Sequence, residues 1–296
     1  MRVTRRDLLI GAAATAAGGV GLSSYAFAIE PSFRLVVKHH TVRSAAWPKD
    51  HPALRIGVIA DLHACEPWMS VDRIDEIVAR TNALEPDIIV VLGDLAAGLK
   101  RFRTRALAPE EWAVPLSRLR APLGIHAVLG NHDWWTNVDA VRFGLSRAGI
   151  PIYENDAIPI RYRRRRFWLA GIGDQIAHQT PTGGFRGVDD LAGTLAQVDN
   201  DDPVVLMVHE PDIFVDVPDR VAVTLAGHTH GGQVRVPGLG RPVVPSAYGQ
   251  RFAYGHIVED NRDLVVSGGL GCSILPVRFG VPPEITLVTL RAPAKA

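Results

Sequence analysis

The sequence predicts an α/β fold in which two mixed sheets pack face to face within one domain and helices flank them. Apolar runs of strand length alternate with helix-like segments between residues 54 and 147, which is typical of βαβ units and a mostly parallel sheet. These runs are apolar almost throughout, as expected of strands covered on both faces. Beyond residue 237 the chain is rich in Gly and Pro and its apolar runs are short. We therefore expect a sandwich of two sheets flanked by helices, in one domain.

Composition narrows the class of protein. The 296 residues suit one large domain or two small ones, and 47% of them are hydrophobic, which is enough for a packed core. The formal net charge is only +1, so composition gives no case for a nucleic-acid-binding protein. Two cysteines, Cys65 and Cys272, are too few for a disulfide scaffold or a thiolate zinc site. We expect both to be small buried residues.

The first 28 residues are typical of an export signal rather than of a folded domain. Arg5 and Arg6 precede an apolar run, rich in Ala and Gly, that ends at Ala28 in a pattern of small residues suited to cleavage. The arginine pair followed by leucines resembles a twin-arginine signal. We therefore expect export by the twin-arginine machinery to the periplasm or cell envelope. Residues 1–28 are then either cleaved or kept as a membrane anchor.

The predicted strands are apolar runs bounded by Gly, Pro or polar residues. Residues 32–42 alternate only partly between polar and apolar, whereas residues 87–92 form a continuous apolar run after Pro86. We expect strands over residues 32–42, 54–60, 87–92, 125–129, 160–169, 203–208, 221–226, 264–267 and 284–290.

The predicted helices carry apolar residues on one face. Ser70 is placed to cap a helix whose apolar residues, from Val71 to Val78, share such a face. A helix over residues 110–119 contains Pro115, which should kink or break it. Further helices are expected near residues 138–147 and 188–197.

Residues that suit metal binding follow five of these strands. They are Asp61-x-His63, Gly93-Asp94, Gly130-Asn131-His132-Asp133, His209-Glu210-Pro211 and Gly227-His228-Thr229-His230. In open α/β sheets the binding site lies outside the carboxyl ends of the strands. His228 and His230 are one residue apart, so an extended backbone points both imidazoles the same way. Neutral imidazole is one of the commonest metal ligands in proteins.

Each motif alone is weak, but all five in this order form a specific pattern. Across residues 54–290 the pattern resembles the calcineurin-like metallophosphoesterase family. The string Gly227–Gln233 and the tail motifs Gly269–Ser273 and Arg278–Glu284 resemble an exported or membrane-associated bacterial branch. That branch is similar to the cell-wall phosphoesterase of bacilli and to the UDP-2,3-diacylglucosamine hydrolase-like proteins.

The resemblance implies a four-layer α/β/β/α sandwich over residues 54–290. A strand and loop over residues 29–53 would precede it, and a tail over residues 291–296 would follow. The resemblance also implies that Asp61, His63 and His230 bind one divalent metal ion, that Asn131, His209 and His228 bind a second, and that Asp94 bridges both. Ligands drawn from Asp, Asn and His without Cys suit manganese, iron or zinc.

In the family interpretation a hydroxide between the two metal ions attacks phosphorus. His132 stabilises the phosphoryl oxygen and protonates the leaving alcohol, and Asp133 orients the His132 imidazole. We therefore expect a binuclear metal-dependent phosphoesterase that acts outside the cytoplasm. Its substrate would be a phosphomonoester, phosphodiester or pyrophosphate, either a small molecule or lipid-linked.

Two alternatives stay open. One is a UDP-2,3-diacylglucosamine-type pyrophosphate hydrolase of lipid A biosynthesis that works at the membrane. The other, from a different class, is a metal-stabilised binding module without turnover, because fold does not determine function. Against that module, the sequence lacks none of the expected ligands.

Residues outside the core set also have simple interpretations. Five arginines, Arg161, Arg163, Arg164, Arg165 and Arg166, suit either a solvated edge or hairpin or contact with anionic lipid headgroups. Trp134 and Trp135 either wall the substrate cleft or pack under the sheet edge. We expect Glu210-Pro211 and Gln233 to shape their loops, and Arg278 to form a structural ion pair rather than to contact phosphate.

Overall fold

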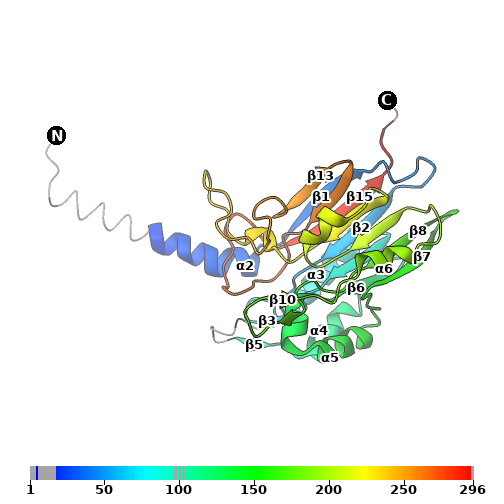
Figure 1. Ribbon diagram of the computed structural model, residues 1–296. Coiled ribbons are helices and arrows are strands. Elements are labelled where there is room, and N and C mark those ends of the chain that lie inside the picture. The colour runs from blue at the N-terminus through cyan, green and yellow to red at the C-terminus, as the bar shows by residue number, and fades with distance from the viewer. Residues whose placement is uncertain (1–4, 6–17, 97–98, 100–101, 103, 295–296) are drawn as a thin grey trace.

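Two mixed sheets pack face to face and helices cover their outer faces, which confirms the predicted four-layer sandwich (Figure 1). The computed structural model describes residues 5, 18–96, 99, 102 and 104–294. Residues 1–4 and 6–17 of the predicted export signal therefore lie outside the described residues. Residues 18–33 are helical, end in η1 (Tyr25–Ile29) and α2 (Glu30–Phe33), and project from one end of the molecule (Figure 1).

The first sheet has five strands in the order β1-β15-β2-β4-β6. They are β1 (Val36–Arg43), β2 (Leu54–Ile59), β4 (Ile88–Leu92), β6 (Ile125–Val128) and β15 (Glu284–Arg291). Strands β2, β4 and β6 run parallel, whereas β15 is antiparallel to β2 and parallel to β1. The carboxyl ends of β2, β4 and β6 therefore lie along one edge. The helices α3 (Val71–Ala83), α4 (Pro109–Leu116) and α5 (Asn131–Arg147) pack on the outer face.

The second sheet has six strands in the order β13-β14-β12-β11-β8-β7. They are β7 (Asp156–Tyr162), β8 (Arg165–Gly171), β11 (Val204–Met207), β12 (Val221–Ala226), β13 (Gly255–Glu259) and β14 (Arg262–Val266). The four central strands are parallel and the two edge strands antiparallel. The outer face carries α6 (Leu191–Ala196) and η2 (Pro211–Asp216). Short elements are β3 (Cys65–Glu66), β5 (Arg105–Ala106), β9 (His178–Gln179), β10 (Phe185–Arg186) and η3 (His230–Gly232).

Three clusters of buried apolar side chains hold the four layers together. Val90 and Leu169 belong to the cluster between the sheets. Trp112 of α4 and Leu145 of α5 belong to the cluster that covers the first sheet, and Phe214 of η2 to the one that covers the second. Successive side chains of a strand face opposite sides, so a strand that contributes to two clusters must be apolar throughout. All five residues of β4 are accordingly buried.

Local signals explain where the helices begin and end. Ser70 caps α3 as predicted, with its Oγ accepting the backbone N–H of Arg73 at 3.2 Å. Helix α4 contains Pro115 and ends at the next residue, so its predicted extension to residue 119 is wrong. Helix α5 begins at Asn131, and its backbone leaves helical geometry at Asn137 (φ −165°, ψ 90°). The helix predicted near residues 138–147 is the part after this kink.

Two predicted strands need correction. The N-terminal strand begins at Val36 rather than at residue 32, because the preceding helical segment continues through Phe33. The strand predicted over residues 160–169 is instead the antiparallel hairpin of β7 and β8, which turns at Arg163 with a φ of 56°. A hairpin was one of the interpretations given to the arginine cluster, but residues 160–169 contain no Gly, Pro, Asn or Asp that would mark the position of the turn.

The arginine cluster lies on this edge hairpin. Arg165 pairs with Asp50, and Arg166 pairs with Asp202 at 3.0 Å. The hairpin and the N-terminal helix lie at opposite ends of the molecule (Figure 1). This arrangement favours the solvated-edge interpretation of the arginines. In the described part of the chain, no helix combines the length and apolar character that crossing a bilayer requires.

Candidate metal centre

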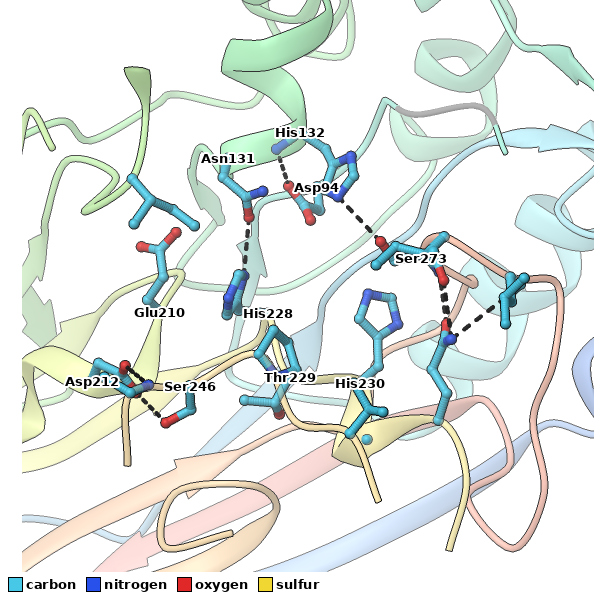
Figure 2. A pocket seen from close by; sticks show the side chains of 18 of the residues that line it. Asp94, Asn131, His132, Glu210, Asp212, His228, Thr229, His230, Ser246 and Ser273 are labelled. Atoms are coloured by element: carbon cyan, nitrogen blue, oxygen red, sulfur yellow. Dashed lines mark hydrogen bonds between the residues drawn. The ribbon is translucent and has the colours of Figure 1, made fainter. Parts of the chain in front are cut away.

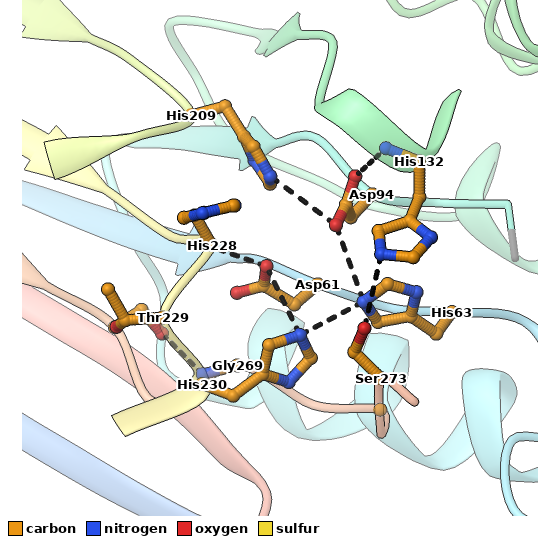
Figure 3. Close-up of polar contacts among 12 residues, drawn as sticks. Asp61, His63, Asp94, His132, His209, His228, Thr229, His230, Gly269 and Ser273 are labelled. Carbon is orange, nitrogen blue, oxygen red and sulfur yellow. Dashed lines mark hydrogen bonds and ion pairs between the residues drawn. The ribbon is translucent and has the colours of Figure 1, made fainter. Parts of the chain in front are cut away.

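The predicted site residues gather where the carboxyl ends of both sheets meet (Figure 3). They follow β2 (Asp61, His63), β4 (Asp94), β6 (Asn131, His132, Asp133), β11 (His209) and β12 (His228, His230). The first three strands belong to one sheet and the last two to the other. The site therefore forms only when the two sheets pack.

Five of these residues adopt backbone conformations that are rare for residues with side chains. The angle φ is positive at Asp61 (53°), His63 (44°), Asp94 (54°), His228 (68°) and His230 (51°). Such conformations cost about 1–3 kcal/mol each and persist only where the surrounding structure imposes them. Strain concentrated in these five residues is typical of a functional site.

The first group of ligand atoms comes from Asp61, His63, Asp94 and His230, which each place one such atom within 4.8 Å of the others. His63 Nε2 lies 3.0 Å from His230 Nε2 and 3.4 Å from Asp94 Oδ2. Asp61 Oδ1 lies 3.7 Å from His230 Nε2. The Oδ2 atoms of Asp61 and Asp94 are buried and have no hydrogen-bond partner among the described residues. Buried, unpartnered oxygens that face imidazole nitrogens fit a divalent cation.

The second group lies next to the first and shares Asp94. Asn131 Oδ1 lies 3.2 Å from His209 Nε2 and 3.0 Å from His228 Nδ1. Asp94 Oδ2 lies 3.4 Å from His209 Nε2, the same distance as from His63 in the first group. This is the position expected of a carboxylate that bridges two metal ions. The Asp and His residues of the two groups therefore fit a two-metal site.

Asp94 and His209 can lie this close to the chain at the start of α5 because Gly130 has no side chain. A Cβ at this position would lie 2.4 Å from Asp94 Oδ1 and 2.6 Å from His209 Cε1. Both neighbours are site residues that cannot move without disturbing the ligand geometry. Only glycine therefore fits between β6 and α5.

Charges contributed by the protein are poorly balanced at the site. Burial lowers the pKa of His63 to about 3 and also lowers the pKa of His228, so both imidazoles are neutral and able to bind a metal ion. Burial, together with the charge of Asp94, raises the pKa of Asp61 and Asp133 to about 7. Buried carboxylates that repel each other in this way are stabilised by bound cations.

His132 reaches the centre from the first turn of α5. Its backbone N–H donates to Asp94 Oδ1 at 2.8 Å, and its Nε2 lies 3.1 Å from Ser273 Oγ. Gln233 holds Ser273 in place, because its Oε1 accepts the Ser273 N–H at 2.7 Å and its Nε2 donates to the Ser273 carbonyl at 3.0 Å. The Gln233 side chain therefore holds the loop of Ser273, and not the loop after the paired histidines that it was predicted to shape.

The prediction that Asp133 orients the His132 imidazole is wrong. Asp133 is fully buried, and its two oxygens accept the backbone N–H groups of Asp94 (2.9 Å), Gly130 (3.0 Å) and Ala96 (3.0 Å). As the third residue of α5, its side chain turns back over the helix N-terminus. Asp133 therefore holds the backbone that carries Asp94, and Ser273 contacts the imidazole instead.

A cavity of about 960 Å³ opens beside the centre. Figure 2 shows Asp94, Asn131, His132, His228 and His230 among the side chains that line it. The lining also has apolar side chains, which include Trp135, Ile176, Phe185, Val243, Ile274 and Leu275. Trp135 stacks on Phe185 with ring centroids 5.5 Å apart, and its indole N–H donates to the Ile176 carbonyl at 3.0 Å.

The two tryptophans therefore differ. Trp135 walls the cavity, whereas Trp134 packs against the core under the first sheet.

Arg278 also departs from prediction, because its buried guanidinium donates to the carbonyls of Gly268, Gly271 and Val281. Within the described residues no carboxylate pairs with it, so the predicted ion pair is wrong. The carbonyls of this glycine-rich loop satisfy the charge of the guanidinium instead. Nη2 of Arg278 lies 3.3 Å from His230 Nδ1.

Sequence reasoning missed two residues near the centre. Ser273 ends the motif Gly269–Ser273, but no local pattern places it beside His132, which it meets only through folding. Asp174 did carry one, because Gly173-Asp174 follows β8 much as Gly93-Asp94 follows β4. Burial, followed by the charge of Glu210, raises the pKa of Asp174 to about 10. The signal was overlooked because β8 was merged with β7.

Comparison with known proteins agrees with this geometry. The calcineurin-like phosphoesterase family model matches residues 54–232. The metallophosphoesterase YkuE of Bacillus subtilis is 29% identical over 98% of this chain and 99% of its own length. The phosphodiesterase YaeI of Escherichia coli is 28% identical over 97% of this chain and 99% of its own length. A solved dimetal phosphatase of Danio rerio aligns with a TM-score of 0.43 and 13% identity, covering 82% of this chain and 100% of that chain.

Divalent metal should stabilise the protein against unfolding. At about 100 times its dissociation constant, bound Mn²⁺ or Zn²⁺ should add about 2.7 kcal/mol, which corresponds to a rise in melting temperature of about 5–10 °C. Asp94→Ala should lose most of this rise, because Asp94 contacts both ligand groups. Asp260→Ala removes a carboxylate that is 88% exposed and should keep the full rise. Thermal melts with and without metal measure the effect, and an undiminished rise in Asp94→Ala would contradict the assignment.

Proposed function

This chain belongs to the calcineurin-like phosphoesterase family and is a metal-dependent phosphoric ester hydrolase, and on that basis we propose that its substrate is a phosphodiester. The single observation that carries the two-metal chemistry is the position of Asp94 Oδ2, 3.4 Å from an imidazole of each ligand group. Similarity to YaeI, a relative named as a phosphodiesterase, supports the choice of a diester. The cavity supports it too, because a diester carries two organic groups on its phosphate.

When bound there, two divalent cations would offset the charge of the phosphate and activate the attacking water. The protein groups then divide the remaining work. Asp133 holds the backbone of Asp94, and the Asp94 side chain in turn accepts the His132 N–H. The imidazole of His132 faces the cavity beside Ser273, where it is placed to donate a proton to the leaving oxygen. Trp135, whose ring centroid lies 5.2 Å from that of His132, would contact the leaving group.

His132→Ala should lower the turnover of bis-p-nitrophenyl phosphate by about 10²–10⁴-fold, because it removes a proton donor that acts in the transition state. The metal content should stay at the wild-type level, since His132 belongs to neither ligand group. Ser273→Ala should have a smaller effect, because it removes only a contact of the imidazole. Turnover by purified full-length protein with manganese, iron or zinc, together with metal analysis, measures both quantities.

Two outcomes would count against this proposal. Wild-type turnover in His132→Ala would refute the role given to that residue. Absence of turnover by the wild type with every metal, on diester, monoester and pyrophosphate substrates alike, would favour the metal-stabilised binding module instead.

A second candidate is a lipid-linked substrate, such as the pyrophosphate of a UDP-diacylglucosamine. The apolar walls of the cavity favour it, and so do large apolar side chains that are exposed at its mouth: Phe185 (51%), Val243 (71%) and Ile274 (72%). Ile274 also has a φ of 63°, which is rare for a β-branched residue. A strained loop that holds an apolar side chain in solvent suits contact with an acyl chain.

Chain length should then affect catalysis. Between p-nitrophenyl methyl phosphate and p-nitrophenyl decyl phosphate, kcat/KM should rise by about 100-fold or more, because each fully buried methylene contributes about fourfold. Ile274→Asp should reduce this preference. Val258→Asp, at a side chain that is 60% exposed on β13, serves as the matched control and should keep it. Equal kcat/KM values for the two esters would exclude the lipid-linked candidate and leave the phosphodiesterase proposal intact.

We also propose that the protein is exported by the twin-arginine route and stays at the cell envelope with its N-terminal helix retained. Arg5 and Arg6 support the route, as in other twin-arginine signals. Packing supports retention, because Ala26 and Glu30 are buried against the domain. The Ala26 carbonyl accepts the N–H of Arg278 at 2.9 Å, and Glu30 accepts the N–H of Gly280 at 3.2 Å.

Replacement of Arg5 and Arg6 by Lys should abolish export, because twin-arginine signals are recognised by the arginine pair. Fractionation of cells that produce the two forms measures this directly. The mass of the exported wild-type protein should include the helix over residues 18–33. A mature N-terminus at Ile29 would show instead that the segment is cleaved.

A further inference from the structure

Glu210 places a buried carboxylate in the wall of the cavity that the proposed mechanism does not use. Its side chain is 4% exposed, and its Oε1 is buried without a hydrogen-bond partner in the described part of the chain. Sequence reasoning assigned Glu210 and Pro211 only to the shape of their loop. The Asp174 carboxyl lies within hydrogen-bond reach of Glu210; its Oδ2 is likewise buried without a partner among the residues described, and burial, followed by the charge of Glu210, raises its pKa to about 10. Two buried carboxyl groups this close must share a proton or have a cation beside them.

Gln175 accounts for the hydrogen bonds of only one of the two carboxylate oxygens of Glu210. The backbone N–H of Gln175 donates to Glu210 Oε2 at 3.0 Å, and its side-chain amide donates to the Glu210 carbonyl at 2.8 Å. These contacts hold the carboxylate in one orientation. It can still accept a proton from the Asp174 carboxyl, and it is open to a cation on the side of the second ligand group. The loop is already held through the backbone carbonyl, so loop shape does not require the carboxylate.

The Glu210 carboxylate lies beside the second ligand group. A carboxylate oxygen of Glu210 and ring nitrogens of His209 and His228 lie within 4.8 Å of one another. Figure 2 shows Glu210 on the side of the cavity where Asn131 and His228 project. Three ligand atoms this close could bind a single ion.

Charge distinguishes the two groups. The first has a carboxylate of its own, Asp61, in addition to the shared Asp94. Without Glu210, the second ligand group would have, besides the shared Asp94, only the neutral amide of Asn131 and the imidazoles of two histidines. An uncompensated carboxylate at this position would also repel the phosphate of a substrate, whereas a carboxylate bound to a cation would not.

We infer that Glu210 is a ligand of the second metal ion, together with Asn131, His209, His228 and the bridging Asp94. The inference rests on the two-metal centre of the proposed function and adds a ligand to the set that the family resemblance implies. The second position then has a carboxylate of its own, as the first has in Asp61. Gln175 is a positioning residue for the Glu210 side chain.

Metal binding tests the inference without reference to activity. Metal-stripped full-length protein is titrated with Zn²⁺ or Mn²⁺ in a calorimeter, and Co²⁺ is used to follow each equivalent by its visible spectrum. The wild type should bind two ions. Glu210→Gln should bind the first ion with unchanged affinity and the second at least about 10-fold more weakly, because a neutral amide replaces a charged ligand. The spectrum of the second Co²⁺ equivalent should change as well.

Asp212 provides a matched control. It lines the same cavity two residues further on, but both of its oxygens are already paired, with Ser246 Oγ at 2.6 Å and with the Ala247 N–H at 2.7 Å. Asp212→Asn should therefore bind both ions as the wild type does. Glu210→Asp keeps the charge on a shorter side chain and should fall between the wild type and Glu210→Gln. It also serves if Glu210→Gln fails to fold.

Outcomes separate this inference from the proposed function. Two ions bound with wild-type affinities and an unchanged Co²⁺ spectrum in Glu210→Gln would overturn the role of Glu210 and leave the two-metal centre standing. A wild type that binds fewer than two ions would overturn the two-metal centre itself. Selective weakening of the second ion in Glu210→Gln but not in Asp212→Asn would establish the ligand.

Discussion

Placement of one buried carboxylate, that of Asp94, is the constraint on which the rest of the site depends. Its Oδ2 must face His63 and His209 at 3.4 Å each, while it is fully enclosed by protein. Backbone contacts achieve this, because Asp133 holds the Asp94 N–H and the His132 N–H holds Oδ1. Oδ2 is therefore the atom left free to face the two imidazoles. A lone buried anion would be unstable here, and two bound divalent cations would supply the opposite charge that makes the arrangement favourable.

Packing of the two sheets supports this constraint. Ligands reach the centre from three strands of one sheet and two of the other, so the apolar cluster between the sheets sets the distances between them. The same cluster stabilises the positive φ angles of the ligand residues, which would not persist in a loosely packed loop. Part of the stability of the core is thus offset by strain at the site. Such a division is typical of enzymes, whose functional residues are less stable than their scaffold.

Beyond the centre, a single loop joins the catalytic residues to the N-terminal helix. Ser273 contacts His132, Arg278 lies 3.3 Å from His230, and the backbone of Arg278 is bound by Ala26 of the helix. The exposed Ile274 lies between these contacts, at the mouth of the apolar part of the cavity. The ligand residues in the cavity wall therefore suit phosphate, and the apolar residues suit an organic group.

The sequence by itself determined the layers of the fold and the candidate ligands, because both depend on local pattern. Apolar runs specify buried strands such as β4, and polar motifs at the strand ends specify which side chains reach the common edge. Only the tertiary structure decided which of those side chains touch. Asp133 binds backbone rather than His132, Ser273 meets His132 across 141 residues of chain, and Glu210 turns toward His228. These contacts follow from how two sheets and a glycine-rich loop pack, and no local pattern of residues encodes that geometry.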